Sequence, residues 1–447
     1  MHVHLTGLPA QRSATVLPIV AASPSDPGTS RRRVLAVMPD WPWPATTGGR
    51  MRAVAIVEAL GAFADVTVLA TQDPQGDAPA AWRSATAAFA RRHASVPARL
   101  ADAGVGLLLG RHVALQRAIA SGMPGAFSNL IAGARPALVI LGRGFGGPFI
   151  EIARQHGARV VLEADESLVD YNRSILRSKS TARARLRAAM DLLAVGRMER
   201  RDFTRADEVW LANESELARV QASLPSVKLR LVPNIAPPIP FEPAGPVNAV
   251  GFVGFFRHPP NEEAAGYLAR SVMPVVRAKG GPGDLRLIGR DPTNGLLALA
   301  ARDSHVAVTG EVADVVPELR AAGVLAMPIT SGGGSRIKAL EAAAAGVPIV
   351  STAFGMAGLA LLAGRDFLDA ESPSAFAEAI TALANDADLR ERLTSNARAA
   401  VAANHSREAL ARAIQDAIAR VPGTCRGVVD PLGLRRRRIW LPRDGER

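Results

Sequence analysis

The sequence predicts an α/β protein built from two doubly wound, parallel-sheet domains of the Rossmann-like type that face each other across a cleft. Three observations predict this class. Short apolar strands alternate with helical segments along most of the chain, which is typical of parallel sheets joined by crossover helices. The chain has 447 residues, more than one typical domain. A proline-rich stretch over residues 234–248 interrupts the alternation and has the composition of a linker.

The domain boundaries follow from where this alternation starts, stops and resumes. The expected segments are an irregular leader (1–32), an N-terminal domain (33–233), a linker (234–248), a C-terminal domain (249–405), a helix that packs back on the N-terminal domain (406–425) and a basic tail (426–447). The leader contains a short apolar run broken by Pro18, which we interpret as an irregular segment rather than a secretion signal.

Composition limits the class of protein further. Apolar residues make up 48% of the chain and aromatic residues only 4%, so the cores must be built mainly from Ala, Val, Leu and Ile. The single cysteine, Cys425, excludes an internal disulfide and a cysteine-based zinc site, which fits a cytoplasmic protein. The formal charge is +12, but much of the excess lies in the two terminal segments. We therefore expect no nucleic-acid partner.

In the N-terminal half, each expected strand is a short run rich in Val, Leu, Ile and Ala. These strands are VLAVM (34–38), DVTVLA (65–70), ALVILG (137–142), ARVVLEA (158–164), DEVWLA (207–212) and VKLRLVP (227–233). Between them, helical patterns cover about 50–62, 78–96 and 112–134, a long charged stretch that ends near Arg201, and a short segment before the last strand.

In the C-terminal half the same alternation continues. The expected strands are 249–255, 284–289, 305–310 and 323–329, with a helix over 260–279 and helical segments over 373–420. Residues 342–364 are uncharged but are interrupted by glycines and a proline. We therefore expect a helix end, a strand and a second short helix there instead of a membrane span.

The stretch SGGGSRIKALEAAAAGVPIVS (331–351) is the most informative part of the chain. It predicts a glycine loop, a helix that begins with Ser335 as N-cap and ends at Gly346, and a buried strand. A glycine loop ahead of a helix exposes backbone N–H groups and the positive end of the helix dipole, which suits an anion.

The charged residues of this helix refine that expectation. Arg336 and Lys338 are unfavourable in a first turn, so they indicate a ligand with more than one negative charge, such as a pyrophosphate. Glu341 shares a helix face with Lys338 and could accept hydrogen bonds from two neighbouring hydroxyls, as on a ribose. A flexible surface loop before a core helix is the alternative that this pattern leaves open.

A second glycine-rich loop, Gly142–Gly147 (GRGFGG), matches the dinucleotide-binding fingerprint, with Glu163 at the end of the next strand. This predicts, as an alternative, a dinucleotide-dependent oxidoreductase with a nicotinamide or flavin site. However, the loop lies in the middle of its domain, and Pro148 follows the last glycine directly. A glycine turn at a strand end is the preferred interpretation.

Other chemistry-bearing residues are few. Asp165, Glu166 and Asp170 follow a strand end and could act in acid–base chemistry, although capping of the next helix is the preferred interpretation. His258 lies on a ligand-side loop, and we interpret it as a solvated histidine. The histidines show no metal-ligand spacing, so we expect neither a metal site nor a bound cofactor.

The C-terminal half, from GFVGFFRHPPNEEAAGYL through LRLIGRDP to VAVTGEVADVVPELRAAGVLAMPITSGGGSRIKALEAAAAGVPIVST, resembles the donor-binding domain of the family 4 retaining glycosyltransferases, also called glycosyl transferases group 1. VMPDWPWPATTGGRMRAVAIVEAL resembles the opening strand and glycine loop of that family. The resemblance implies the GT-B architecture and metal-independent transfer of a sugar from a nucleotide-sugar to an acceptor hydroxyl, with retained configuration.

The resemblance also implies roles for single residues. Glu341 matches the second acid of the family's E-x7-E motif, which holds the donor ribose, whereas the first acid is replaced by Gly333. The paired cations usual after the first C-terminal strand are absent, and Arg257 is the nearest cation. The implied catalytic residues are Arg336 and Lys338, and the implied donor-binding residues are Gly48, Gly49, Arg257, Gly333, Gly334, Ser335, Arg336, Lys338 and Glu341.

The resemblance further implies a nucleotide-sugar donor and a glycan or lipid-linked acceptor as partners. Arginines and Trp440 in the tail 426–447 could contact an anionic membrane surface, which would place the protein at the inner face of the membrane. Two alternatives remain open: another enzyme of the same architecture, such as a sugar-nucleotide epimerase or a phosphorylase, and a binding protein for anionic polymers.

Overall fold

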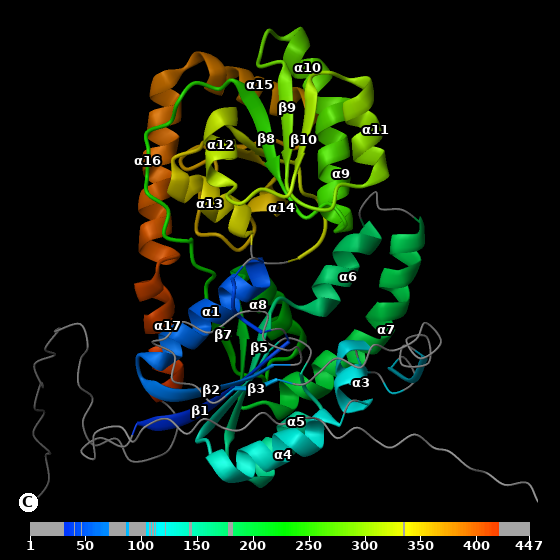
Figure 1. Ribbon diagram of the computed structural model, residues 1–447, viewed down its shortest axis with the longest axis vertical. Coiled ribbons are helices and arrows are strands. Elements are labelled where there is room, and N and C mark those ends of the chain that lie inside the picture. Colours follow the sequence, from blue (N-terminus) through cyan, green and yellow to red (C-terminus); the bar gives the residue numbers. More distant parts are fainter. Residues whose placement is uncertain are drawn as a thin grey trace, which may run out of the picture.

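The computed structural model describes two α/β domains, one above the other in Figure 1. The described residues are 31–39, 41–45, 47–70, 86–88, 104–106, 109, 111, 113–120, 122–142, 145–177, 182–333 and 336–419. The leader and the basic tail, with the membrane contact expected of the tail, lie outside this part of the chain.

The N-terminal domain contains a seven-stranded, all-parallel sheet with the order β3-β2-β1-β4-β5-β6-β7. Its central strands are buried on both faces, as their uninterrupted apolar sequences predict. The strands are β1 (Arg32–Met38), β2 (Ala64–Ala70), β3 (Thr86–Ala88), β4 (Leu138–Gly142), β5 (Arg159–Asp165), β6 (Glu208–Leu211) and β7 (Leu229–Leu231).

Helices cover both faces of this sheet, and each face has its own hydrophobic core. One core is built around Phe127 and Phe149, and the other around Trp41 and Trp210. The helices are α1 (Gly48–Gly61), α3 (Val113–Ala120), α4 (Met123–Ala134), α5 (Pro148–Gln155), α6 (Leu168–Arg177), α7 (Ala182–Arg205) and α8 (Glu214–Ser223).

The C-terminal domain repeats this design with a six-stranded parallel sheet of order β10-β9-β8-β11-β12-β13. In both sheets the strand order reverses next to the first strand, so both are doubly wound as predicted. The strands are β8 (Ala249–Val253), β9 (Asp284–Ile288), β10 (Val306–Gly310), β11 (Leu325–Met327), β12 (Ile349–Ser351) and β13 (Leu368–Asp369).

The helices of this domain surround a single large core that includes the alanine-rich face of α13. The helices are α9 (Pro259–Tyr267), a π-helical turn η1 (Leu268–Val272), α10 (Met273–Ala278), α11 (Asn294–Arg302), α12 (Val316–Ala322), α13 (Ile337–Ala345), α14 (Ala353–Met356), α15 (Pro373–Asn385) and α16 (Ala387–Asn404).

The chain passes between the domains twice. The linker, 234–248, contains neither helix nor strand, as its prolines predict. After α16 the last described helix, α17 (Arg407–Ala419), returns to the N-terminal domain and packs against α1, as Figure 1 shows on its left side. Leu410, Ile414 and Ile418 of α17 belong to one of the N-terminal cores.

Some expected helices differ from those observed. Of the helix expected over 78–96, only 86–88 are described, and they form the edge strand β3, paired in parallel with Val68–Ala70. Pairing with a neighbouring strand has overridden the helix propensity of alanine here. The helix expected over 112–134 is divided at Gly122, which has a φ of 82°.

The uncharged stretch 342–364 forms the end of α13, strand β12 and the short helix α14, as predicted. Within the described chain, none of the helices combines the length and the hydropathy that a bilayer crossing requires.

Candidate active site between the two domains

The loop after β11 and the start of α13 lie between the domains. Helix α13 begins one residue later than predicted: its N-cap is Arg336, in the left-handed region at a φ of 49°, and not Ser335. The end is as predicted, because Gly346 closes the helix with a φ of 83°. The predicted donor-binding residues Gly334 and Ser335 lie outside the described residues.

Lys338 lies in the first turn of α13 and points toward strand β8 and the start of α9. Its Nζ donates a hydrogen bond to Oδ1 of Asn261 at 2.8 Å and lies 4.6 Å from the ring centre of Phe252. Burial and the positive charge of Arg336 lower the pKa of Lys338 to about 7, although Glu341 opposes this shift. An anion bound here would restore the charge of the lysine.

Glu341 lies one turn further along α13. Burial raises its pKa, while the charge of Lys338 lowers it. Within the described chain, Lys338 and Glu341 form no direct ion pair, so the lysine is not held at this position by the acid. The role of Glu341 in donor binding stays a prediction.

The guanidinium of Arg336 folds back over its own loop. It donates hydrogen bonds to the carbonyl oxygens of Gly333 at 2.8 Å and Phe354 at 3.3 Å. Burial lowers the pKa of Arg336, and the negative charges of Glu166, Glu216 and Asp165 oppose that shift. These three acids belong to the N-terminal domain, so the loop of one domain faces an acidic cluster of the other.

The glycine loop of the N-terminal domain also reaches α13. Thr47 caps α1 by accepting a hydrogen bond from the backbone N–H of Arg50 at 3.3 Å. A Cβ added at Gly48 would lie 3.4 Å from Cγ1 of Ile337, whereas one at Gly49 would meet nothing within 4 Å. Gly48 thus lies against the start of α13, and open space lies beside Gly49.

Direct contacts join the carboxyl ends of the two sheets. The hydroxyl of Tyr171 lies 3.3 Å from Nε2 of His258, and Ser174 accepts a hydrogen bond from the backbone N–H of Gly332 at 2.8 Å. The interpretation of His258 as a solvated histidine is therefore wrong. Sequence patterns gave no indication of Tyr171, Ser174 or Asn261, because their partners belong to other segments of the chain.

The remaining predicted donor-binding cation, Arg257, is exposed to solvent. It follows β8 on the same loop as His258. Within the described chain no hydrogen bond or ion pair of this residue is found, so its role in donor binding stays a prediction.

The acids after β5 do not cap α6, contrary to the preferred interpretation. Asp165 lies 3.3 Å from Nε of the buried Arg52. The N–H groups at the start of α6 are instead bound by Glu199 and Glu216, which come from α7 and α8, and by Ser167. Such partners cannot be inferred from local spacing.

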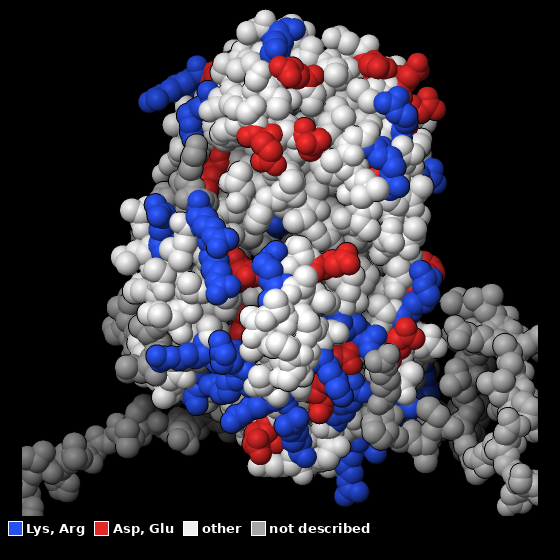
Figure 2. Space-filling view, turned by 180° about the vertical axis from the view of Figure 1, so that it is seen from behind, with Lys and Arg blue, Asp and Glu red and all other residues white. Residues whose placement is uncertain are grey.

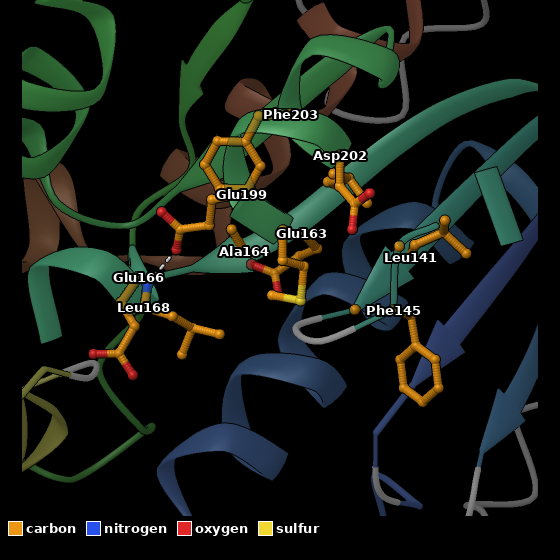
Figure 3. A pocket seen from close by; sticks show the side chains of 13 residues that line it. Leu141, Phe145, Glu163, Ala164, Glu166, Leu168, Glu199, Asp202 and Phe203 are labelled. Atoms are coloured by element: carbon orange, nitrogen blue, oxygen red, sulfur yellow. Dashed lines mark hydrogen bonds between the residues drawn. The ribbon is translucent and has the colours of Figure 1, made fainter. Parts of the chain in front are cut away.

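Glu199 and Glu166 flank a small cavity inside the N-terminal domain (Figure 3). The cavity has a volume of about 40 Å³, which suits a water molecule but not a nucleotide. In Figure 3 the carboxylate of Glu199 points to the backbone N–H of Leu168, while that of Glu166 points away toward the yellow ribbon of the C-terminal domain.

Burial raises the pKa of Glu199 to about 7, from a usual value of 4.5. The folded protein therefore holds this proton more tightly than the unfolded chain, and the free energy of unfolding should fall as the pH rises from about 4.5 through 7. The contribution of one such group is about 3 kcal/mol. Burial raises the pKa of Glu216 to about 7 as well, so we expect Glu199→Gln to reduce the slope of this part of the pH profile without abolishing it, measured by urea unfolding between pH 4.5 and 9. Glu214→Gln, at an exposed acid of α8, should leave the slope unchanged; an unchanged slope in Glu199→Gln as well would contradict the assignment.

The loop Gly142–Gly147 does not have the space that a dinucleotide needs. A Cβ at Gly146 would lie 2.1 Å from Oδ2 of Asp202, so a buried carboxylate packs directly on the loop just before α5. This carboxylate is also paired with Arg201 at 2.7 Å, so side chains of the protein already occupy the position that a pyrophosphate would take. The geometry therefore disfavours the oxidoreductase alternative.

Two parallel-sheet domains that meet at the carboxyl ends of their strands, with a glycine loop and partly buried cations between them, define a GT-B protein. Among described residues, no group of three or more His, Cys, Asp and Glu is arranged to hold a metal ion. Residues 247–386 match the family model described as Glycosyl transferases group 1. None of the curated protein sequences matches the chain significantly.

Solved structures share this fold at low sequence identity. Sucrose-phosphate synthase from Thermosynechococcus elongatus has a TM-score of 0.64 at 16% identity, with 87% of this chain and 98% of that chain covered. A glycosyltransferase from Rickettsia africae ESF-5 has a TM-score of 0.58 at 12% identity, covering 88% and 99%. HepE from Anabaena, in complex with UDP and glucose, has a TM-score of 0.56 at 12% identity, covering 88% and 100%. The fold and the family-model match together support a GT-B glycosyltransferase.

Proposed function

We propose that the protein is a retaining, metal-independent glycosyltransferase that moves a hexosyl group from a nucleotide-diphosphate sugar to a hydroxyl of a glycan or glycolipid. The observation that carries this proposal is the pair Arg336 and Lys338, two partly buried cations at the N-terminal end of α13. Arg336 faces acids of the other domain. Two neighbouring, partly buried cations with a lowered lysine pKa suit a diphosphate, whose charge would stabilise both.

In this proposal the donor diphosphate lies against the start of α13. Lys338 and Arg336 neutralise the negative charge that grows on the phosphate as the sugar leaves, which a divalent metal does in other enzymes. Gly48 and Gly49 approach the phosphates from the N-terminal domain. Glu341 accepts hydrogen bonds from the ribose hydroxyls, and the departing phosphate takes the proton of the attacking acceptor hydroxyl.

The charge distribution gives less support to a binding protein for anionic polymers. On the face seen in Figure 2, Lys and Arg side chains over the lower half are interspersed with Asp and Glu and form no single continuous basic surface. A polymer of negative charge is usually bound along such a surface.

A donor screen tests the proposal directly. UDP-, GDP- and ADP-sugars are incubated with the protein and glycan or glycolipid acceptors, and release of the nucleoside diphosphate is measured with and without EDTA. UDP-glucose is the first probe, since the Anabaena structure contains UDP and glucose. We expect acceptor-dependent release that survives EDTA. Loss of activity that Mg²⁺ or Mn²⁺ restores would contradict metal independence, and an inverted anomeric product would contradict retention.

Glu341→Gln should weaken donor use while it preserves shape. A hydrogen bond to a charged group contributes about 1.5–3 kcal/mol, so kcat/KM for the donor should fall by about 10- to 150-fold. Glu378→Gln, at an exposed acid of α15, is the matched control and should leave kcat/KM unchanged. Equal kinetics in Glu341→Gln and the control would remove Glu341 from the donor site.

A further inference from the structure

The carboxylate of Glu166 fills the space above Gly333. A Cβ added at Gly333 would lie only 1.3 Å from Oε2 of Glu166 and 3.2 Å from Cδ2 of Tyr171. Any side chain at position 333 is therefore incompatible with the present position of Glu166. The N-terminal domain places a carboxylate on the glycine loop of the C-terminal domain, where the loop itself has none.

The backbone before Glu166 directs it to this position. The pairing of β5 with β6 shifts register between Glu163 and Asp165, and Asp165 has a φ of 59°. A register shift in a strand and a non-glycine residue in the left-handed region can each redirect a side chain. Both features are frequent at functional sites. Since Glu199, Glu216 and Ser167 bind the N–H groups of α6, Glu166 is not needed to cap that helix.

The chemistry of a carboxylate limits what Glu166 can bind. Only 6% of the residue is exposed, and an ionised carboxylate accepts hydrogen bonds but donates none. A diphosphate bound to Arg336 and Lys338 would repel it. The group that meets Glu166 must therefore offer hydrogen-bond donors beside the diphosphate, which in a nucleotide-sugar means the hydroxyls of the sugar.

We propose that Glu166 accepts a hydrogen bond from a hydroxyl of the transferred sugar, and that it thereby selects the sugar part of the donor from the opposite domain. This inference rests on the proposed function. Gly333 is its necessary counterpart, because only a residue without a side chain leaves room for the carboxylate. The donor site is then shared: the C-terminal domain binds the nucleoside diphosphate, and Glu166 of the N-terminal domain binds the sugar.

The test separates the sugar from the nucleotide. The donor is the nucleotide-sugar that the wild-type protein uses best. Titration calorimetry measures the affinity for this donor and for its free nucleoside diphosphate. Steady-state kinetics give kcat/KM for two epimeric sugars on the same nucleotide. Glu166→Gln should keep the affinity for the nucleoside diphosphate within about twofold, and should lower that for the nucleotide-sugar by about tenfold or more. The preference between the epimers should shrink toward equality.

Two further variants support the interpretation of this test. Gly333→Ala displaces the carboxylate without removing it and should give the same pattern. Glu214→Gln is the control, because it removes an exposed acid at the start of α8 that, within the described residues, contacts neither Arg336 nor Glu166. It should leave both affinities and the epimer preference as in wild type.

An equal loss of both affinities in Glu166→Gln, or an unchanged epimer preference in both Glu166→Gln and Gly333→Ala, would overturn the inference. Neither result would contradict the proposed function, because nucleotide-sugar turnover by wild type is measured in the same experiment. If the wild-type protein binds no nucleoside diphosphate, the proposed function itself is wrong. The results described above would contradict only the role of Glu166, so the two outcomes are distinguishable.

Discussion

Replacement of Lys338 by alanine should lower kcat by about 10²- to 10³-fold, because it removes a preorganised positive charge from the position where negative charge develops. The donor KM should rise less, since the charge on the leaving phosphate is larger in the transition state than in the bound donor. Steady-state kinetics and a thermal melt on the same preparation measure the effect. A normal kcat in a well-folded Lys338→Ala protein would overturn the leaving-group role.

The pH dependence gives a second measure of the same residue. With a pKa of about 7 in the free enzyme, Lys338 loses its proton above neutral pH. Because kcat/KM reports ionisations of the free enzyme, it should fall as the pH rises through 7. Lys338→Arg keeps its charge at high pH, so we expect partial activity without this fall. A wild-type profile that stays level from pH 6 to 9 would contradict the lowered pKa.

Replacement of Arg52 by methionine should lower the free energy of unfolding by about 3–5 kcal/mol, the cost of leaving buried charges without their partner. Arg52 is 4% exposed, and its Nη2 lies 2.6 Å from Oε1 of Glu163. It also binds the carbonyl oxygen of Val232 at 3.0 Å and Oδ1 of Asn234 at 2.8 Å. Its removal leaves the carboxylates of Glu163 and Asp165 buried together.

Urea unfolding measures this loss, and the chain offers a matched control. Arg187 and Asp191 form an exposed ion pair on α7, with 77% and 45% of their side chains accessible. Exposed pairs contribute about 0–1 kcal/mol, so Arg187→Met should change stability little. Glu163→Gln in the Arg52→Met background should recover part of the loss. Similar losses in Arg52→Met and Arg187→Met would show that the buried cluster is not held by the arginine.

The fold could be predicted from the sequence because the patterns that mark its strands and its linker each lie within a short segment. Each central strand is a continuous apolar run, and the linker is marked by its prolines. Strand β3 could not be predicted, because Thr86–Ala88 has the composition of a helix and becomes a strand only by pairing with β2. The N-cap of α13 was misplaced by one residue because Arg336 adopts a left-handed conformation that sequence seldom indicates.

The candidate site was predictable only in part. Arg336, Lys338 and Glu341 are neighbours in the sequence, and the chemistry of a glycine loop before a helix identifies them together. The sequence places Asp165 and Glu166 near a strand end, but the position of Glu166 over Gly333 depends on how the two domains pack, and no local pattern indicates that. The same holds for Asn261, which is identified only as the partner of Lys338.

The return of α17 to the N-terminal domain affects how the protein can be made. Leu410, Ile414 and Ile418 complete a core whose other members lie before the linker, and Arg407 forms an ion pair with Glu58 of α1. Domains usually fold as units in the order in which the ribosome produces them. Here one hydrophobic core of the first domain stays incomplete until α17, which follows the whole second domain, has been synthesised. The second domain, which needs no later segment for its core, can therefore finish folding before the first.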